Sequence, residues 1–540
     1  MIPSPPVPGA TPPAPGRSRA VVGLTALSIV LALALVAVSL AWWTERDEAS
    51  ADGDDSAAVT TTTTAGPAEP PAAGSDEGDE PFGDLPDDGG LPDGADEPFG
   101  DLPDDGEASE ESDNPLEGLL DGLLGGDLGQ SMDQLSGLSP ECLGGSIWDL
   151  LGGLGGGEEL TGTLAEQVQQ IADSVEQHRG LQFTEPVEPK LVPAEEFDQN
   201  MAEMVTEEYR AGDADIDSRI LSLLGAIPEG TDLRALQSDL LAGQVAGYYD
   251  PETGDIVVRD DGDGEMDATE RLTLAHELDH ALTDQALGLP DTDVEGQSDA
   301  NLAGLALVEG DATLLMQQWA LTNLGLADQF QQLLDPQVAQ AQADLEKVPP
   351  YLRQELMFPY LNGLSYACRL FVDGEWPAVD AAYDTPPATT AEILYEDREG
   401  VAPVDPTDPG RLDAPWIEAR RDTIGAAQLQ WLFSAPGGDE DAALAEASAL
   451  ASRWAGGEMV LATNADHSAL GVSLVDRADG MVLCDAVERW YDASFDDERT
   501  VDGTTATYEA ADRVAVLSCD GRDVRLGIGP DHQTAAALVG

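Results

Sequence analysis

Helical and strand patterns follow one another along the chain from about residue 158. Apolar residues recur every three to four positions in four stretches, which predicts amphipathic helices at residues 164–178, 193–209, 267–289 and 298–324. Residues 244–261 instead resemble two short strands joined by a turn that contains Asp, Pro and Gly. The third helix opens with Asp267 and Glu270 at the spacing of a capping box. These patterns predict an α+β fold.

The region from residue 410 to residue 540 is also mixed. Helical patterns occur at IGAAQLQWLF and DAALAEASALASRW, and strand-like runs follow at EMVLATN, GMVLCDAV and VAVLSC. No catalytic constellation is recognisable in this region. We therefore divide the globular part into a core of residues 158–409 and a C-terminal α+β region of residues 410–540 that packs on it.

An apolar run without any charge covers residues 20–43. About 20 such residues are enough to cross a membrane as a helix, so the run predicts one membrane span. Arg17 and Arg19 precede it, which places the Pro-rich residues 1–19 in the cytoplasm and the remaining chain on the outer side of the cell membrane. The sequence SLA near the end of the run also resembles a signal-peptide cleavage site. Both interpretations export the chain, and the length of the run favours an uncleaved signal anchor.

Two segments separate this run from the globular part. Residues 44–114 are acidic, rich in Pro, Gly, Thr and Ala, and contain DEPFGDLPDDG twice. They have too few large apolar residues to offset the entropy of ordering, which predicts a disordered linker. Residues 115–157 are rich in Leu and Gly, and their leucines form one apolar helical face. This face could pack on the folded domain, on a partner or on the membrane.

Charge and cysteine content narrow the class of protein further. The chain has 105 acidic and 24 basic residues, a formal net charge of −81. Such a charge repels phosphate backbones, so we expect no nucleic-acid partner. Four cysteines suit an exported protein with disulfides. Cys484 and Cys519, in two strand-like runs, are the preferred pair, and Cys142 with Cys368 would form a second bridge, although three connectivities stay open.

The stretch HELDH, residues 276–280, contains the candidate metal-binding and catalytic residues. Its histidines are four positions apart, so both imidazoles lie on one face of a helix and can bind one metal ion. Zinc accepts neutral imidazole nitrogens and, in catalytic sites, a third protein ligand and a water molecule. Glu277 lies beside His276, where it can take a proton from that water. The motif therefore predicts metal-assisted hydrolysis.

The residues around the motif resemble a known family. AHELDHALTDQALGL is similar to the active-site helix of thermolysin-like gluzincins, zinc metallopeptidases that bind the metal through two histidines and a glutamate. A wider block, from GYYDPETGDIVV to ALVEGDAT, resembles little-characterised bacterial gluzincin-like proteins over roughly residues 185 to 400. The resemblance implies a zincin-like core in which His276 and His280 bind Zn²⁺ and Glu277 is the general base.

The resemblance also implies a third ligand, a glutamate on the following helix. Glu309 in VEGDAT is the best candidate because its apolar neighbours would direct it inward. It follows His280 by 29 residues, a longer separation than in thermolysin. Glu295, in the polar loop DTDVEGQSD, is the alternative ligand.

Several further residues are expected to support such a site. Asp284, which matches the family motif, and Asp311 could accept hydrogen bonds from the ligands. Gluzincins place a His or Tyr against the developing oxyanion, which makes three tyrosines candidates: Tyr351, Tyr360 and Tyr366. The strand containing Tyr248 and Tyr249 would provide the edge along which an extended peptide lies.

Together these features predict a membrane-anchored, extracytoplasmic zinc peptidase. Its expected partners are a peptide or protein substrate and the membrane, which it would reach through one N-terminal helix. The alternative is a non-catalytic zinc-binding envelope protein on the same fold. The intact Glu277 favours the enzyme, because a binding module has no need of a general base.

Overall fold

A computed structural model describes the following residues of the chain: 142, 160–187, 189–197, 199–201, 211–236, 247–251, 253–260, 266–325, 343–438 and 444–540. All of them belong to one compact unit. Among them, no helix has both the length and the apolar character that a membrane span requires. The predicted tail (1–19), membrane span (20–43) and linker (44–114) lie outside the described residues, as does the Leu/Gly-rich segment (115–157) apart from Cys142.

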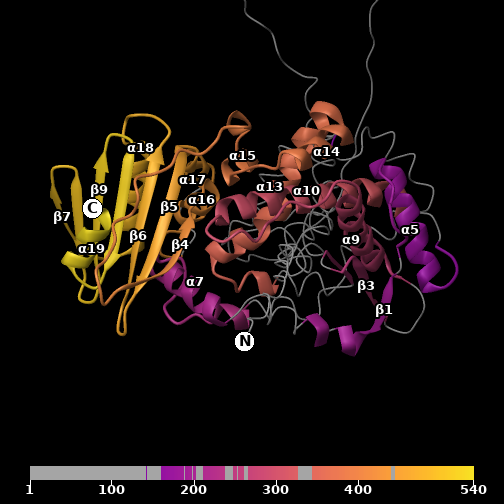
Figure 1. The fold of residues 1–540 in the computed structure, drawn as a ribbon, viewed down its shortest axis with the longest axis horizontal. Coiled ribbons are helices and arrows are strands. Elements are labelled where there is room, and N and C mark those ends of the chain that lie inside the picture. Colours follow the sequence, from indigo (N-terminus) through magenta and orange to yellow (C-terminus); the bar gives the residue numbers. More distant parts are fainter. Residues whose placement is uncertain are drawn as a thin grey trace, which may run out of the picture. The chain divides into compact units, whose positions relative to one another are not determined.

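A three-stranded sheet and helix α5 open the described core (Figure 1). Helix α5 (Leu164–Arg179) begins at a capping box of Thr163 and Glu166. In the sheet, β1 (Lys190–Pro193) pairs in parallel with β3 (Asp255–Asp260), and β3 pairs antiparallel with β2 (Gly247–Asp250). The strand order is β1-β3-β2, so β2 is an edge strand of this sheet within the described residues. The predicted hairpin is therefore present, with Gly254 in its turn at a positive φ of 74°.

The helix predicted at 193–209 is described only in part. Residue 193 is the last residue of β1, and helical conformation follows at residues 194–197 and 199–201. The rest of that prediction lies outside the described residues. Helix α7 (Ala211–Leu223) comes next in the described chain.

The following helices form the centre of the core. They are α9 (Ala268–Ala286), α10 (Ser298–Asn323), α13 (Pro350–Gly374), α14 (Trp376–Asp384) and α15 (Thr390–Leu394). Helices α10 and α13 approach closely at Gly310 and Gly363. A Cβ atom added to Gly310 would overlap the backbone of Gly363, and one added to Gly363 would overlap the carbonyl oxygen of Ala306. The two glycines thus permit backbone contact directly beside Glu309.

The C-terminal region contains a seven-stranded sheet of order β4-β5-β6-β10-β9-β8-β7, antiparallel throughout, drawn from orange to yellow in Figure 1. Its strands are β4 (Ile417–Thr423), β5 (Trp454–Thr463), β6 (Ser468–Asp476), β7 (Glu498–Asp502), β8 (Thr505–Glu509), β9 (Val514–Asp520) and β10 (Asp523–Gly529). Its helices are α16 (Ala426–Ser434), α17 (Leu444–Ala451), α18 (Val482–Ser494) and α19 (His532–Val539).

Both faces of the sheet are covered. Along β9, Ala515, Leu517 and Cys519 belong to the large apolar core, whereas Val516 packs with Ala535 of α19. Successive side chains of a strand point to opposite faces, so α19 covers the face opposite the large core.

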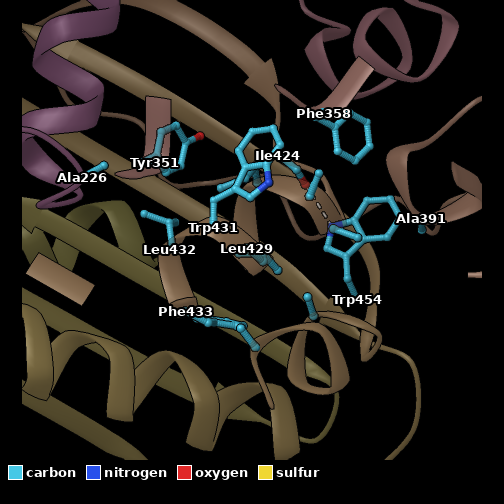
Figure 2. Close-up of a cluster of buried hydrophobic side chains, with 14 of the residues drawn as sticks. Ala226, Tyr351, Phe358, Ala391, Ile424, Leu429, Trp431, Leu432, Phe433 and Trp454 are labelled. Atoms are coloured by element: carbon cyan, nitrogen blue, oxygen red, sulfur yellow. Dashed lines mark hydrogen bonds between the residues drawn. The ribbon is translucent and has the colours of Figure 1, made fainter. Parts of the chain in front are cut away.

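One apolar core continues from the central helices into this sheet. Trp431 of α16 packs against Tyr351 and Phe358 of α13, with ring centroids 5.4 and 5.6 Å away (Figure 2). Trp454 of β5 is 2% exposed and donates its indole N–H to the carbonyl of Ile424 at 2.9 Å. The C-terminal region is thus packed on the helices of the preceding region.

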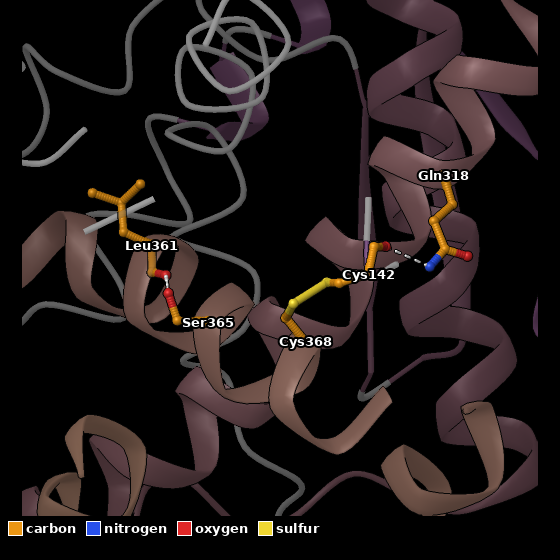
Figure 3. Close-up of a disulfide and its surroundings, with 5 residues drawn as sticks. All are labelled: Cys142, Gln318, Leu361, Ser365 and Cys368. Carbon is orange, nitrogen blue, oxygen red and sulfur yellow. Dashed lines mark hydrogen bonds between the residues drawn. A yellow bond between two sulfur atoms is a disulfide. The ribbon is translucent and has the colours of Figure 1, made fainter. Parts of the chain in front are cut away.

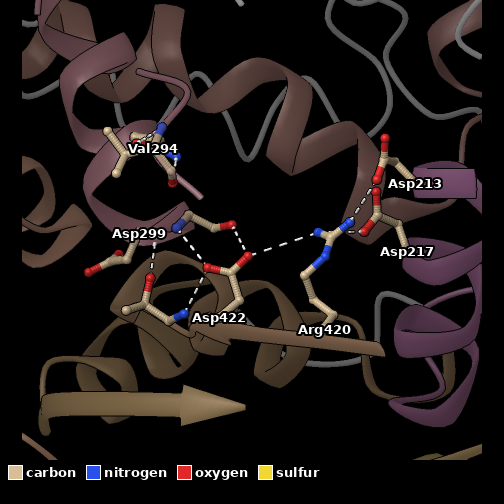
Figure 4. A network of polar contacts seen from close by, with 9 residues as sticks. Asp213, Asp217, Val294, Asp299, Arg420 and Asp422 are labelled. Carbon is tan, nitrogen blue, oxygen red and sulfur yellow. Dashed lines mark hydrogen bonds and ion pairs between the residues drawn. The ribbon is translucent and has the colours of Figure 1, made fainter. Parts of the chain in front are cut away.

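Polar contacts join the same two regions at the start of α10 (Figure 4). Asp422 of β4 accepts hydrogen bonds from the backbone and side chain of Ser298 at 2.9 and 2.6 Å. Arg420 of the same strand forms ion pairs with Asp213 and Asp217 of α7 at 3.3 and 3.5 Å. The contacts of Asp422 hold the N-terminal end of α10, the helix that carries Glu309, and those of Arg420 attach α7 to the same strand.

Two disulfides are present, and they pair the cysteines as preferred from the sequence. Cys484 is bonded to Cys519, and Cys142 to Cys368 of α13, which lies 226 positions further along the chain (Figure 3). The carbonyl of Cys142 also accepts a hydrogen bond from Gln318 of α10 at 2.9 Å. Residue 142 is therefore attached to both α10 and α13.

The strand predicted at GMVLCDAV is wrong, because Cys484 lies in helix α18. Buried residues of α18 recur with helical spacing as far as its last turn: Leu483, Cys484, Val487, Trp490 and Tyr491. The strand-like run covers only the first two turns of this pattern, which is too short to separate a helix from a strand.

Candidate metal centre

Helix α9 carries the HELDH motif through the interior of the core. Its capping box is present as predicted, with Asp267 accepting from the backbone N–H of Glu270 at 2.8 Å. Every residue from 272 to 283 is buried. His276 and His280 are 0 and 1% exposed, although an imidazole usually keeps some contact with water. The buried polar side chains of α9 need partners inside the protein, and these partners show where the site lies.

Three side chains from two helices converge on one point. His276 Nε2 and His280 Nε2 are 3.0 Å apart, and Glu309 Oε2 of α10 lies 3.1 Å from the first and 3.4 Å from the second. The two imidazole rings are nearly perpendicular, at 88°. His276, His280 and Glu309 form a group whose donor atoms could hold a metal ion.

His276 Nε2, His280 Nε2 and Glu309 Oε2 form a triangle whose size fits a tetrahedral metal ion. Bonds of about 2.0–2.1 Å at tetrahedral angles place neighbouring ligand atoms about 3.3 Å apart, close to the three observed separations. Glu309 is fully buried, and its Oε1 has no hydrogen-bond partner. Two imidazole nitrogens that face each other also cannot both donate a proton. A cation between the three groups would satisfy them all. Glu295, the alternative third ligand, is exposed and does not belong to the group.

Proton affinities within the triangle are strongly perturbed. Burial and the neighbouring His280 lower the pKa of His276, with Glu309 acting in the opposite direction. Burial also opposes a charge on His280, but Glu309, together with Glu277 and Asp279, outweighs it and raises the pKa of His280 to about 9. Despite burial, the two histidines lower the pKa of Glu309 to about 2. Glu309 thus favours the protonated form of His280, and the histidines favour the ionised form of Glu309.

Glu277 lies beside the triangle and is held by the edge strand. Its Oε2 accepts a hydrogen bond from the backbone N–H of Tyr249 at 2.9 Å, and its Oε1 has no hydrogen-bond partner. Burial raises the pKa of Glu277 to about 8, against the opposing effect of His280. A carboxyl group whose pKa lies near neutrality is suited to proton transfer.

The two carboxylates predicted to support the ligands both accept a hydrogen bond from a tyrosine hydroxyl. Asp284 accepts a hydrogen bond from the hydroxyl of Tyr249 at 2.7 Å. Tyr249 thereby contacts α9 twice, through its amide to Glu277 and through its hydroxyl to Asp284. Asp311 accepts hydrogen bonds from Arg179 and from the hydroxyl of Tyr383, both at 2.8 Å.

Of the three candidate oxyanion stabilisers, the structure brings Tyr360 to the triangle. Its ring centroid lies 6.5 Å from that of His276. Burial, Glu309 and Glu277 raise the pKa of Tyr360 well above the usual value, so its hydroxyl keeps its proton. Tyr351 instead packs on Trp431, and Tyr366 lies beside Arg369 at 5.3 Å. With a helical rise of about 1.5 Å per residue, six or nine positions along α13 move a side chain roughly 9–14 Å from the level of Tyr360.

The two tyrosines predicted for the edge strand point in opposite directions, as successive strand residues do. Tyr249 faces α9, as described above. Tyr248 packs against Phe197, with ring centroids 5.7 Å apart. Only Tyr249 therefore contacts the metal-centre helix through a hydrogen bond of its side chain.

Sequence reasoning missed Arg179 and the residues that join it and Asp311 in one polar network: Asp279, Asp380 and Tyr383. A signal for Arg179 exists in the sequence, because it continues the apolar face of α5 one turn after Val175. A charged residue in such a position requires a buried partner.

No family model, curated protein or solved structure matches the chain. The interpretation of the site therefore rests on its own residues and geometry.

Proposed function

We propose that the protein is a zinc-dependent peptidase of the gluzincin type, built on a zincin-like core. The observation that carries the proposal is the convergence of His276, His280 and Glu309 within 3.0–3.4 Å of one another. Two imidazoles and one carboxylate are the ligand set of one class of catalytic zinc site, which keeps a fourth position open. Borderline-soft zinc suits these donors better than the harder magnesium or calcium, which prefer oxygen ligands.

The proposed reaction depends on Glu277 and Tyr360, which lie near the metal-binding group but are not metal ligands. A zinc ion at this site would act as a Lewis acid towards water and towards the carbonyl group of a peptide bond. Glu277 then has the role of general base: it accepts a proton from the attacking water at its free Oε1 and returns it to the leaving amine. The hydroxyl of Tyr360 is the nearest candidate donor for the developing oxyanion.

The substrate is a peptide or protein segment in extended conformation. Support comes from the position of Glu277 at the outer edge of β2, where the N–H of Tyr249 points away from β3. An extended chain that aligns with this edge would bring its backbone next to the general base.

We also propose that the peptidase acts outside the cytoplasm, anchored by the apolar run at 20–43. All four cysteines are paired in disulfides, a state that is typical of oxidising compartments.

A non-catalytic zinc-binding envelope protein is the second candidate. The observation that favours it is the burial of the three ligand side chains, which are at most 1% exposed. A peptide bond must reach the metal for hydrolysis, whereas a structural ion needs no access.

Metal content and peptide hydrolysis of the full chain distinguish these candidates. We expect the wild type to bind about one zinc per chain and to cleave denatured casein or a fluorescence-quenched library of unstructured peptides. Glu277→Gln should retain zinc and lose hydrolysis by about 10²–10⁴-fold. Glu295→Gln, the same change on an exposed loop, should leave both unchanged. Zinc in both wild type and Glu277→Gln with hydrolysis by neither would support the binding module, and a wild type without affinity for metal would exclude both candidates.

A further inference from the structure

Arg179, the last residue of α5, reaches into the space between the two helices that carry the metal-binding group. The side chain is fully buried, and its guanidinium lies 4.4 Å from the centre of the Trp376 ring. The backbone turns away directly afterwards, because Gly180 caps α5 with a φ of 74°. A left-handed residue at this position lets α5 end while the Arg179 side chain continues inward.

One guanidinium contacts both helices of the site. Its NH2 nitrogen lies 2.8 Å from Asp311 Oδ2 on α10, two positions after Glu309. Its Nε lies 3.6 Å from Asp279 Oδ1 on α9, next to His280 in the sequence, which is an ion-pair contact longer than a hydrogen bond. Both carboxylates are buried, at 0 and 1% exposure. Among the described residues, no other lysine or arginine forms an ion pair with either of them.

A third element fixes the guanidinium from the other side. Asp380 of α14 accepts from the NH1 nitrogen at 2.5 Å, and Tyr383 of the same helix donates its hydroxyl to Asp311. Burial alone would lower the pKa of Arg179, but Asp311 and Asp279 raise it, so the guanidinium stays charged. The planar fork of arginine can meet several carboxylates at once, which a lysine ammonium cannot do with the same geometry.

The spacing of α9 and α10, which Arg179 contacts, determines the geometry of the metal-binding group. The donor atoms come from α9 and α10, and their separations of 3.0–3.4 Å fit one ion only while the two helices keep their spacing. Catalytic constellations need positions held to about 0.5 Å. Asp279 and Asp311 are the attachment points of Arg179 on the two helices, and each lies within two residues of a ligand.

We propose that Arg179 is a positioning residue of the metal centre: by bridging Asp279 and Asp311 it holds the two ligand helices at the spacing that zinc requires. The proposal rests on the proposed zinc-binding function and extends it, because metal affinity then depends on α5, a helix that contributes no ligand. Arg179 contacts neither the metal-binding atoms nor the substrate edge, so it acts only through the two helices.

The test compares Arg179→Met and Arg179→Lys with a matched control, Arg453→Met, in the full chain. Arg453 also pairs with a buried aspartate, Asp476, at 2.6 Å, but it lies in the C-terminal region. For each variant the zinc dissociation constant is measured by chelator competition, the visible absorption spectrum is recorded with Co²⁺ in the site, and thermal unfolding is measured without metal.

Removing a residue that orients metal ligands typically weakens metal affinity about 10–100-fold. We expect this loss for Arg179→Met together with an altered Co²⁺ spectrum, and a smaller loss for Arg179→Lys. Arg453→Met should lower the unfolding temperature but change neither the zinc dissociation constant nor the spectrum. A merely structural role of Arg179 would move the unfolding temperature of both Met variants and leave the spectrum alone.

Two outcomes would overturn the proposal. The first is a folded Arg179→Met variant with a zinc dissociation constant within about twofold of wild type and an unchanged Co²⁺ spectrum. The second is an equal loss of affinity in Arg453→Met. If Arg179→Met does not fold, Arg179→Met/Asp311→Asn is judged by the same criterion, because it also removes the charge of Asp311, the carboxylate that is hydrogen-bonded to Arg179 on α10. A wild type that binds no zinc is a separate result, which refutes the proposed function itself.

Discussion

The two halves of the described core bury different kinds of side chains. Around α9 and α10, charged and titratable groups fill the interior: Arg179, His276, Glu277, Asp279, His280, Glu309 and Asp311 are all at most 1% exposed. Between α16, α18 and the seven-stranded sheet, the interior is apolar, with Trp431, Leu432, Trp490 and Leu517 among its members. Burying charge costs free energy unless every group is paired, whereas apolar burial stabilises the fold directly.

The contrast separates an interior that contains a candidate metal-binding group from one that is apolar. An apolar core would have stabilised α9 and α10 as well, so stability does not explain their buried carboxylates and imidazoles. The C-terminal region, in contrast, anchors the start of α10 through Ser298 and Asp422 and brings no group into the triangle. We therefore expect changes in the two regions to affect different measured quantities.

The largest effect on stability is expected from the disulfides, one in each region. Replacing Cys142 and Cys368 by serine opens a loop of 226 residues, and replacing Cys484 and Cys519 opens one of 35. The chain-entropy description predicts losses of roughly 5 and 4 kcal/mol in the free energy of unfolding. Guanidinium denaturation of the two double variants measures these losses. A larger loss for Cys484/Cys519 would show that residue 142 contributes little to holding α10 and α13.

Truncation of a core tryptophan tests the stabilising region alone. Trp454→Ala removes a side chain that is 2% exposed, and the lost packing should lower the free energy of unfolding by about 3–5 kcal/mol. Ile417→Ala, at a 69% exposed residue of the same sheet, should change it by less than about 0.5 kcal/mol. Urea denaturation gives both values. The zinc affinity of folded Trp454→Ala should equal that of wild type, and a weaker affinity would contradict the separation of the two regions.

The secondary structure around the metal-binding group could be predicted from the sequence. The helix at HELDH, the helix that carries Glu309 and the hairpin before them follow from the spacing of apolar residues and from capping and turn residues within short windows. The metal-binding group depends on one spacing of four residues and one glutamate with apolar neighbours. Its prediction from sequence was therefore feasible.

The contacts across the fold could not be predicted in the same way. Arg179 and Asp311 are 132 residues apart, and no local pattern indicates that they meet. Tyr360 was indistinguishable from Tyr351 and Tyr366 until the direction of α13 was known. GMVLCDAV resembles a strand because its apolar run is short, and the helical spacing of the buried residues becomes evident only over the full length of α18.

The smallest predicted effect concerns the pH dependence of metal binding. Because the pKa of His280 is raised to about 9 in the metal-free protein, zinc must displace a proton from it at neutral pH. The zinc association constant should thus increase about tenfold per pH unit between pH 7 and 8 and level off above pH 9. Calorimetric titration at pH 7.5 in two buffers of different ionisation enthalpy should detect about one proton released per zinc. A pH-independent constant would indicate that His280 is already neutral.

The most direct test of the central claim is X-ray absorption at the zinc edge of the loaded full chain, beside Glu309→Gln and Glu295→Gln. We predict two imidazole nitrogens at about 2.0–2.1 Å and light oxygen donors in a four-coordinate shell, with no sulfur. Glu309→Gln should change this shell, and Glu295→Gln should not. A shell with fewer than two imidazoles, or one that Glu309→Gln leaves intact, would contradict the assignment of His276, His280 and Glu309 as the metal ligands.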